Sequence, residues 1–450
     1  MSDMTASASG AHAHDHGHAH DDHHHADLSQ ENTSAPSGWG RTFGLAMIGL
    51  GGLGCLATLA YPFVAGGEGD AAAKAQKHAA ASYHVGVMVA LGLALGPMAL
   101  VLIFNLVKAG WSVTLRRQLE NMASLVWLPV LLLIPTIVVG AIKPGILFKW
   151  MTPGLAEQDA LLEHKLPFLN PVFFYIRLAV YALVWIYLGT RLLRYSREQD
   201  ITGDKWITNK AGRTSAWGIL VYALAVAFAS FDLIKALDFH WFSTMFGVYF
   251  FAGNMVAGLS LLVLTLICIR RSGRLIGLVT DEHLHDLGKL CFAFTVFWAY
   301  IAFSQYFLIW YANIPEETAW VLLRGGGKIT NEWTIVFWIL LVGHFIVPFL
   351  FLLWRANKRS FTTLGIAASL LLVMHCLDMF WVIRPGVYAL VPVKGEIIPG
   401  KLGFSWVDIT GLIGPVCLFL GFLAWKVGSN PLIPLRDPRL PEALHHKNYV

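Results

Sequence analysis

Five ionisable residues lie inside or at the ends of long apolar runs of this 450-residue chain: His84, Asp232, His375, Asp378 and Asp408. An ionisable group is costly at membrane depth, so each is by default a functional candidate. Carboxylates and imidazoles can accept and release protons, and imidazole does so near neutral pH. We therefore predict that these five residues form a proton relay.

Two pairs of these groups have a helical spacing of three residues. His375 and Asp378 would share a helix face, where the carboxylate can hold the imidazole by a hydrogen bond. Asp232 and Lys235 have the same spacing, which predicts an ion pair that serves either the relay or only as an interfacial anchor. His344 lies near the middle of its run, where a histidine hydrogen-bonded to a neighbouring helix is the simpler interpretation than a haem ligand.

The five cysteines are scattered singly and form no C-x-x-C, no C-x-x-C-H and no four-cysteine spacing. We therefore expect no haem or iron–sulfur cofactor bound by this chain, and we assign no catalytic residue. A histidine-rich run at residues 12–25 is able to bind a transition metal weakly, but flexible ligands make an unselective site, so we assign no metal site.

The composition is 56% hydrophobic and only 14% charged, which excludes an ordinary soluble domain. Apolar runs long enough to cross a bilayer occur repeatedly. We predict an all-α polytopic membrane protein with about ten transmembrane helices at 42–64, 83–107, 124–142, 170–194, 215–237, 244–269, 289–311, 332–354, 361–384 and 404–426.

The domain organisation follows from these spans. Residues 1–38 are predicted to be a disordered His-rich tail, 39–82 the first transmembrane helix and a loop, and 427–450 a second tail after the last helix at 404–426. Asp232 and Asp378 each lie 17 residues from the predicted start of their spans. This symmetry suggests that 83–237 and 244–384 are two copies of one four-helix bundle, with two further helices at the periphery.

The distribution of lysine and arginine predicts the orientation. The loops after the second, fourth, sixth and eighth spans carry most of these cations, which places them and both termini in the cytoplasm. With that orientation the five relay candidates gather toward the outer side of the membrane. The cytoplasmic half is expected to hold few polar groups.

Several long strings of the sequence are typical of one family. They lie at residues 108–111, 115–120, 148–151, 164–170, 231–249, 302–306, 310–317 and 344–349, and include HWFSTMFGVY at 240–249. They resemble the NrfD-like membrane subunits of alternative complex III, a bacterial quinol:cytochrome c oxidoreductase. One departure is Phe104-Asn105, where the family often has two histidines.

This resemblance implies a multi-pass protein of the bacterial inner membrane with ten spans in two four-helix bundles. It implies an NrfD-like sister subunit, an iron–sulfur subunit and haem c subunits as partners, with the electrons carried by those partners. Quinone and membrane lipid are the other expected partners, and no nucleic acid is expected.

The leading functional hypothesis is a membrane subunit that supports quinone contact, an outer proton half-channel, or both. A quinone needs an apolar slot with one or two polar groups, for which Gln305, Tyr306 and His240 are the candidates. A transporter, perhaps for a metal ion, and a purely structural scaffold remain as alternatives.

Overall fold

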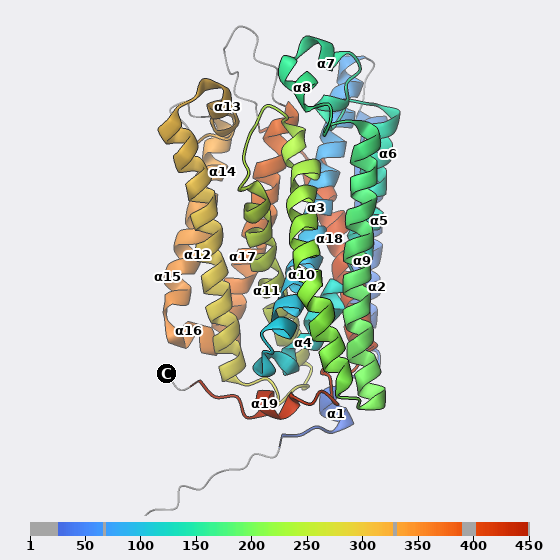
Figure 1. Cartoon of the computed structure of the whole chain (residues 1–450), viewed down its shortest axis with the longest axis vertical. Helices are drawn as coiled ribbons and strands as arrows, with labels where there is room; N and C mark the ends of the chain where they lie inside the picture. The colour runs from blue at the N-terminus through green and yellow to red at the C-terminus, as the bar shows by residue number, and fades with distance from the viewer. Residues whose placement is uncertain (1–25, 66–68, 327–330, 389–401, 449–450) are drawn as a thin grey trace, which may run out of the picture.

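The protein is an all-α polytopic membrane protein, as the sequence predicts. The computed structural model describes residues 26–65, 69–326, 331–388 and 402–448. Within these ranges, ten helical segments are long and apolar enough to cross a membrane. They stand side by side and roughly parallel (Figure 1).

Eight of the spanning segments are single helices, with these bounds: α2 (Arg41–Ala65), α3 (Asp70–Leu106), α9 (Pro171–Thr202), α10 (Trp206–Leu233), α11 (Phe246–Arg271), α12 (Asp281–Ala312), α17 (Phe361–Tyr388) and α18 (Trp406–Gly428). The third segment is divided into a 3₁₀ turn (Gly110–Ser112), α4 (Val113–Ala123), α5 (Trp127–Leu132) and α6 (Ile134–Ile142). The eighth consists of α14 (Glu332–Leu340), a π-helical turn (Leu341–Ile346) and α15 (Val347–Leu353).

Short helices mark the two ends of the molecule. One end, which we name the α7–α8 end, carries α7 (Leu155–Gln158), α8 (Ala160–Lys165) and α13 (Pro315–Leu323), with 3₁₀ turns at Lys149–Met151 and Lys235–Leu237. The opposite end, named the α19 end, carries α1 (Gln30–Thr33), α16 (Arg355–Arg359) and α19 (Leu440–Leu444) (Figure 1).

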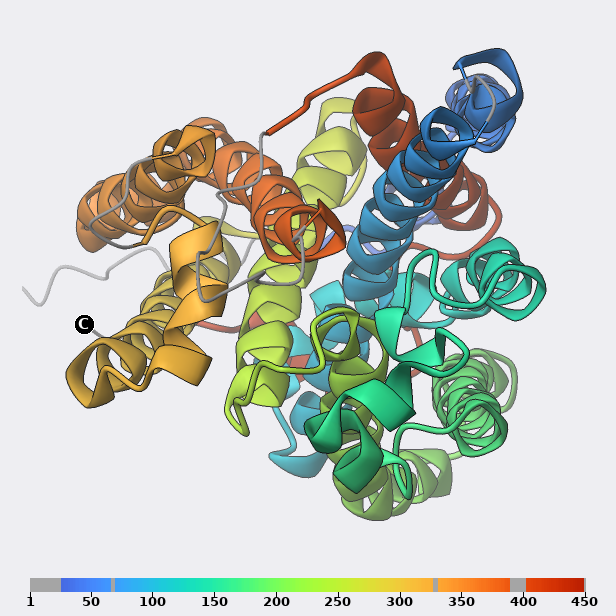
Figure 2. The same ribbon diagram turned by 90° about the horizontal axis from the view of Figure 1, so that it is seen from above.

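Helices α3 and α11 pack against each other at the centre of the molecule. Both are apolar on all sides, as expected of helices that other helices surround. Gly96 allows the close approach, because a Cβ atom there would lie 1.9 Å from the carbonyl oxygen of Asn254. Around this pair, α12 and α14–α17 lie on one side, α5, α6, α9 and α10 on the other, and α2 with α18 at the periphery (Figure 2).

The predicted disordered tail at 1–38 is wrong for residues 26–38. Asn32 of α1 is buried and forms hydrogen bonds with both the carbonyl and the amide of Ile276, at 2.9 Å each. This side-chain pairing satisfies the loop after α11 and orders the segment. Residues 1–25, which include the histidine-rich run, lie outside the described residues.

The predicted loop that precedes residue 83 is also wrong. Helix α3 begins at Asp70 and has 37 residues, a length of roughly 56 Å, which exceeds the hydrocarbon core. Its first turns are rich in alanine, the best helix former, but they are too polar to resemble a span. Hydropathy therefore located only the apolar part of a longer helix.

The polar stretch between the second and third predicted spans is a buried helix and not a loop. Every residue of α4 is buried, including Arg116, Arg117 and Glu120. The segment after α18 runs beneath it, with Leu432 and Ile433 fully buried, so residues 429–448 are packed and do not form a free tail. The expectation of few polar groups in the half near the α19 end is therefore wrong.

Candidate functional site

Asp378, in α17, accepts hydrogen bonds from two aromatic side chains of other helices. The Tyr249 hydroxyl of α11 donates to Oδ1, and the Trp298 indole of α12 donates to Oδ2 at 3.2 Å. All three side chains are buried. No basic side chain among the described residues forms an ion pair with Asp378, so this buried acid is held by neutral donors alone.

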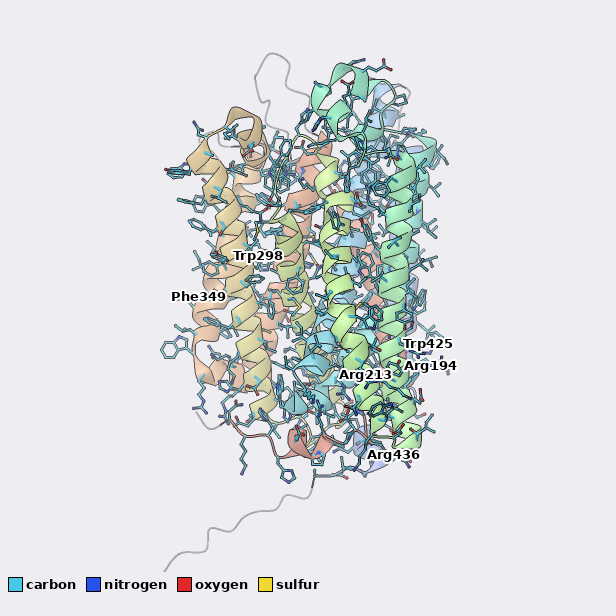
Figure 3. The ribbon with its side chains drawn as sticks, in the orientation of Figure 1. Arg194, Arg213, Trp298, Phe349, Trp425 and Arg436 are labelled. Carbon is cyan, nitrogen blue, oxygen red and sulfur yellow. The ribbon has the colours of Figure 1, made fainter. Side chains whose placement is uncertain are left out.

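A cavity of about 390 Å³ lies beside this acid, between α11, α12, α14 and α17. Its lining is largely aromatic: Trp241, Phe246, Tyr249, Trp298, Tyr300, Phe303, Tyr306, Trp320, Phe337, Phe345 and Trp381, with Asp378 and Gln305 among the few polar groups. Tyr300 and Phe303 line the cavity and are also 63% and 62% exposed. The cavity therefore reaches the lipid-facing side of α12; Figure 3 labels Trp298 on its inner side.

A stack of three side chains closes the cavity toward the α7–α8 end. The rings of Trp241 and Trp320 are 3.9 Å apart and nearly parallel, and the Arg324 guanidinium lies 3.7 Å above Trp320. Arg324 is buried and donates to two backbone carbonyls, those of Trp320 and Val382. Sequence reasoning missed Arg324 because it lies between two spans, where an arginine usually faces water.

The three quinone-contact candidates lie in two different places. Gln305 and Tyr306 both line the cavity, and the Gln305 side-chain oxygen accepts from the Ser243 hydroxyl at 2.7 Å. His240 does not line it. Its ring is half-exposed and pairs with Asp159 at 2.7 Å in the loop that leads into α8. Burial would raise the pKa of Asp159, but the Leu162 amide and His240 outweigh it and lower that pKa.

His344 lies behind Trp298 on the π-helical turn. Pro348 follows four residues later and has no N–H to donate to the His344 carbonyl, which explains why the regular helix is interrupted here. The His344 ring packs on Trp298 with 3.9 Å between centroids. Neither ring nitrogen has a hydrogen-bond partner within the described residues, which is unusual for a buried polar group.

His375 is in the same situation, and the predicted hydrogen bond with Asp378 is wrong. Its ring faces α3 and α11, where Cβ positions built at Gly92 and Gly253 would lie 3.2 and 3.4 Å from its nitrogens. Asp378 is turned toward the cavity instead. Asn254, which sequence reasoning missed, lies against Gly92 too, and its amide is also without a hydrogen-bond partner in the described chain.

Asp232 pairs with Arg177 of α9, so the predicted ion pair with Lys235 is wrong. The guanidinium makes two hydrogen bonds to the carboxylate, at 2.8 and 2.6 Å, and Tyr181 adds a third at 2.9 Å. A bidentate arginine–carboxylate pair is stronger than a lysine contact one helical turn away. The Lys235 side chain instead lies near the rings of Phe231 and Phe242.

Asp408, at the start of α18, forms a third buried cluster. It accepts from Ser82 at 2.6 Å and from Arg384 at 2.8 Å, and His78 lies 2.9 Å away. The remaining relay candidate, His84, is well inside α3 and bonds to the carbonyl of Leu233 at 2.8 Å. The partners Arg177, Arg384 and His78 come from distant parts of the chain, which no spacing rule could have found.

The predicted relay is thus divided among separate clusters. No hydrogen bond between described side chains joins the networks around Asp232, Asp378 and Asp408. Two of the three acids are neutralised by arginine, which is typical of a structural role. Only Asp378 combines neutral partners with an adjoining cavity, so it is the strongest candidate for chemistry.

A second charged cluster lies at the α19 end. Arg117 of α4 pairs with Asp200 at 2.5 Å and with Glu120 at 3.4 Å. Arg116 pairs with Glu120 and with Asp437, which lies 321 residues later in the chain. The cluster is buried and its charges are matched.

No protein-family model matches the sequence, and no curated protein matches it. Among the described residues, no group of three or more His, Cys, Asp and Glu side chains could hold a metal ion. What stands is the fold class, a polytopic α-helical membrane protein, together with the geometry around Asp378.

Proposed function

We propose that the chain is the membrane subunit of a quinol-oxidising respiratory complex of the alternative complex III type, and that a quinone ring occupies the aromatic cavity beside Asp378. The observation that carries the proposal is the meeting of a buried carboxylate with an aromatic cavity that reaches the lipid-facing side of α12. A quinone is an apolar molecule with two polar atoms, and this lining suits such a ligand.

The chemistry assigned to Asp378 is proton acceptance. Oxidation of a quinol to a quinone releases two protons and two electrons, and the electrons pass to iron–sulfur and haem c carriers in the partner subunits. A quinol hydroxyl within hydrogen-bond reach of Asp378 can give up its proton to the carboxylate. This transfer breaks no ion pair, in contrast with protonation of Asp232 or Asp408.

Tyr249 and Trp298 have a positioning role in this proposal. Their donor groups fix the carboxylate of Asp378 at the cavity wall. Gln305 and Tyr306 are placed to contact the second polar atom of the ring, because they line the same cavity. The bacterial inner membrane as location, and both termini on the cytoplasmic side, belong to the same proposal.

The test is Asp378→Asn in the native complex, with quinol:cytochrome c activity as the readout. Loss of a proton acceptor predicts a decrease in turnover of about 100-fold or more. Asp281→Asn is the matched control, since Asp281 is an exposed carboxylate at the start of α12. Unchanged activity in Asp378→Asn would overturn the assignment.

A second readout locates the quinone directly. A photoreactive quinone analogue added to the complex should label α12 and α14 near Tyr306 and Phe337, which line the cavity and are in ring contact. Labelling confined to a sister subunit would remove quinone binding from this chain.

A further inference from the structure

A second cavity, of about 250 Å³, lies at the α7–α8 end and is lined in part by two lysines, Lys165 and Lys235. Lys165 ends α8, and Lys235 begins the 3₁₀ turn after α10. The rest of the lining includes Phe168, Phe231 and Asp238. We name it the lysine cavity.

The two ammonium groups have few partners of their own. Lys165 donates to the carbonyl of Phe239 at 2.6 Å and lies 3.8 Å from the ring centre of Phe242. Lys235 forms no hydrogen bond to any described residue and lies 5.4 Å from the ring centre of Phe231. Neither lysine makes an ion pair within the described part of the chain. Both amines are therefore available to an anion.

Positive charge is in excess around the lysine cavity. Lys149 also interacts with Asp238, and the other nearby acid, Asp159, is already paired with His240. Burial and the neighbouring charge of Lys235 lower the pKa of Lys165 to about 8 in spite of these acids. A bound anion would relieve this repulsion.

An apolar strip leads from the lysine cavity along α10. Phe231, Phe228, Leu224 and Leu220 follow one another at helical spacing, and the last three are 42%, 61% and 67% exposed. The rings of Phe231 and Phe228 are in contact, with centroids 6.0 Å apart. Exposed apolar residues of a spanning helix face lipid, so this strip suits an acyl chain.

We propose that the lysine cavity binds the phosphate headgroup of an anionic phospholipid, with one acyl chain lying on the strip Phe231, Phe228 and Leu224. Basic pockets among spanning helices bind such headgroups, because phosphate gains from each nearby cation. A free phosphate ion would use the lysines but not the strip. The proposal does not depend on quinone binding in the other cavity.

The test is lipid binding to the purified full-length chain by native mass spectrometry. Phosphatidylglycerol is added to the wild type and to the double variant Lys165→Gln/Lys235→Gln, with phosphatidylcholine as the neutral lipid. Loss of two cations predicts binding of phosphatidylglycerol weaker by about tenfold or more. The control Lys74→Gln/Lys143→Gln removes two exposed lysines at the same end and should bind as the wild type does.

Two further variants make each outcome decisive. Lys235→Gln alone removes no hydrogen bond to the described chain, so it should fold normally and lose part of the affinity. Leu224→Ser should weaken phosphatidylglycerol binding but leave inorganic phosphate unaffected, which distinguishes a lipid from a free anion.

Three results would overturn the proposal. The first is equal binding of phosphatidylglycerol by the wild type and the double lysine variant. The second is inorganic phosphate that binds as tightly as the lipid, with no effect of Leu224→Ser. The third is crosslinking of both lysines to a protein partner in the native complex.

Discussion

The two ends of the molecule treat buried charge in opposite ways. At the α19 end, Arg116 and Arg117 are matched by Glu120, Asp200 and Asp437, and the cluster fastens α4 to α9 and to the chain segment after α18. Toward the α7–α8 end, Asp378 meets only a hydroxyl and an indole and faces a cavity.

This difference teaches how to separate structural charges from candidates for chemistry. A buried ion pair with matched partners resists any change of protonation, since loss of one charge leaves the other unpaired. A buried acid held by neutral donors is free to exchange a proton. Burial alone therefore does not identify a functional residue, whereas the character of its partners helps to do so.

The largest expected effect is at the matched cluster. Arg117→Met leaves Glu120 and Asp200 without one of their cations in a buried setting, so we expect the free energy of unfolding to fall by about 3–5 kcal/mol. Thermal unfolding of the purified protein measures this. Arg194→Met, at an exposed position of α9 (Figure 3), should change it by less than about 0.5 kcal/mol. Equal effects of the two variants would remove the contrast.

A smaller effect is expected when the charge of Asp378 is removed. Asn retains an oxygen that accepts a hydrogen bond and leaves no cation behind, so Asp378→Asn should alter the free energy of unfolding by less than about 1.5 kcal/mol. The same thermal unfolding assay applies. A loss as large as that of Arg117→Met would mean that Asp378 belongs to a structural ion pair.

The smallest effect concerns the titration of Lys165. Because its pKa is lowered to about 8 from an ordinary value of 10.5, the amine is neutral and nucleophilic above about pH 8. Its rate of acetylation should rise with a midpoint near pH 8, with the exposed Lys74 as the reference for reagent loss. Between about pH 8 and 10.5 the unfolded chain binds this proton more tightly, so the contribution of Lys165 to stability increases with pH. A midpoint near 10.5 would indicate a compensating anion in the lysine cavity.

The sequence predicted the ten spans because a bilayer demands long apolar helices and little else. It also singled out Asp378, Gln305 and Tyr306, which are polar groups in apolar runs and do meet at one cavity. Helix α4 escaped detection because its charged residues resemble those of a loop. Their burial depends on Asp437, and no local pattern reveals so distant a partner.

Local spacing was also misleading where it seemed most informative. His375 and Asp378 are three residues apart, yet each turns to a different neighbouring helix. Asp232 prefers Arg177, 55 residues earlier, to Lys235. Spacing within a helix defines which contacts are allowed, but tertiary packing decides which are made.

The pairing of Arg116 with Asp437 has a consequence for biosynthesis. A ribosome synthesises α4 long before it reaches Asp437, so the early spans enter the bilayer with this arginine lacking one of its two carboxylate partners. Shielding of α4 from lipid or solvent must wait for the arrival of the segment after α18. Premature termination ahead of residue 437 would thus release a protein whose helices are all present but whose interior charge remains unbalanced, a natural signal for quality-control proteolysis.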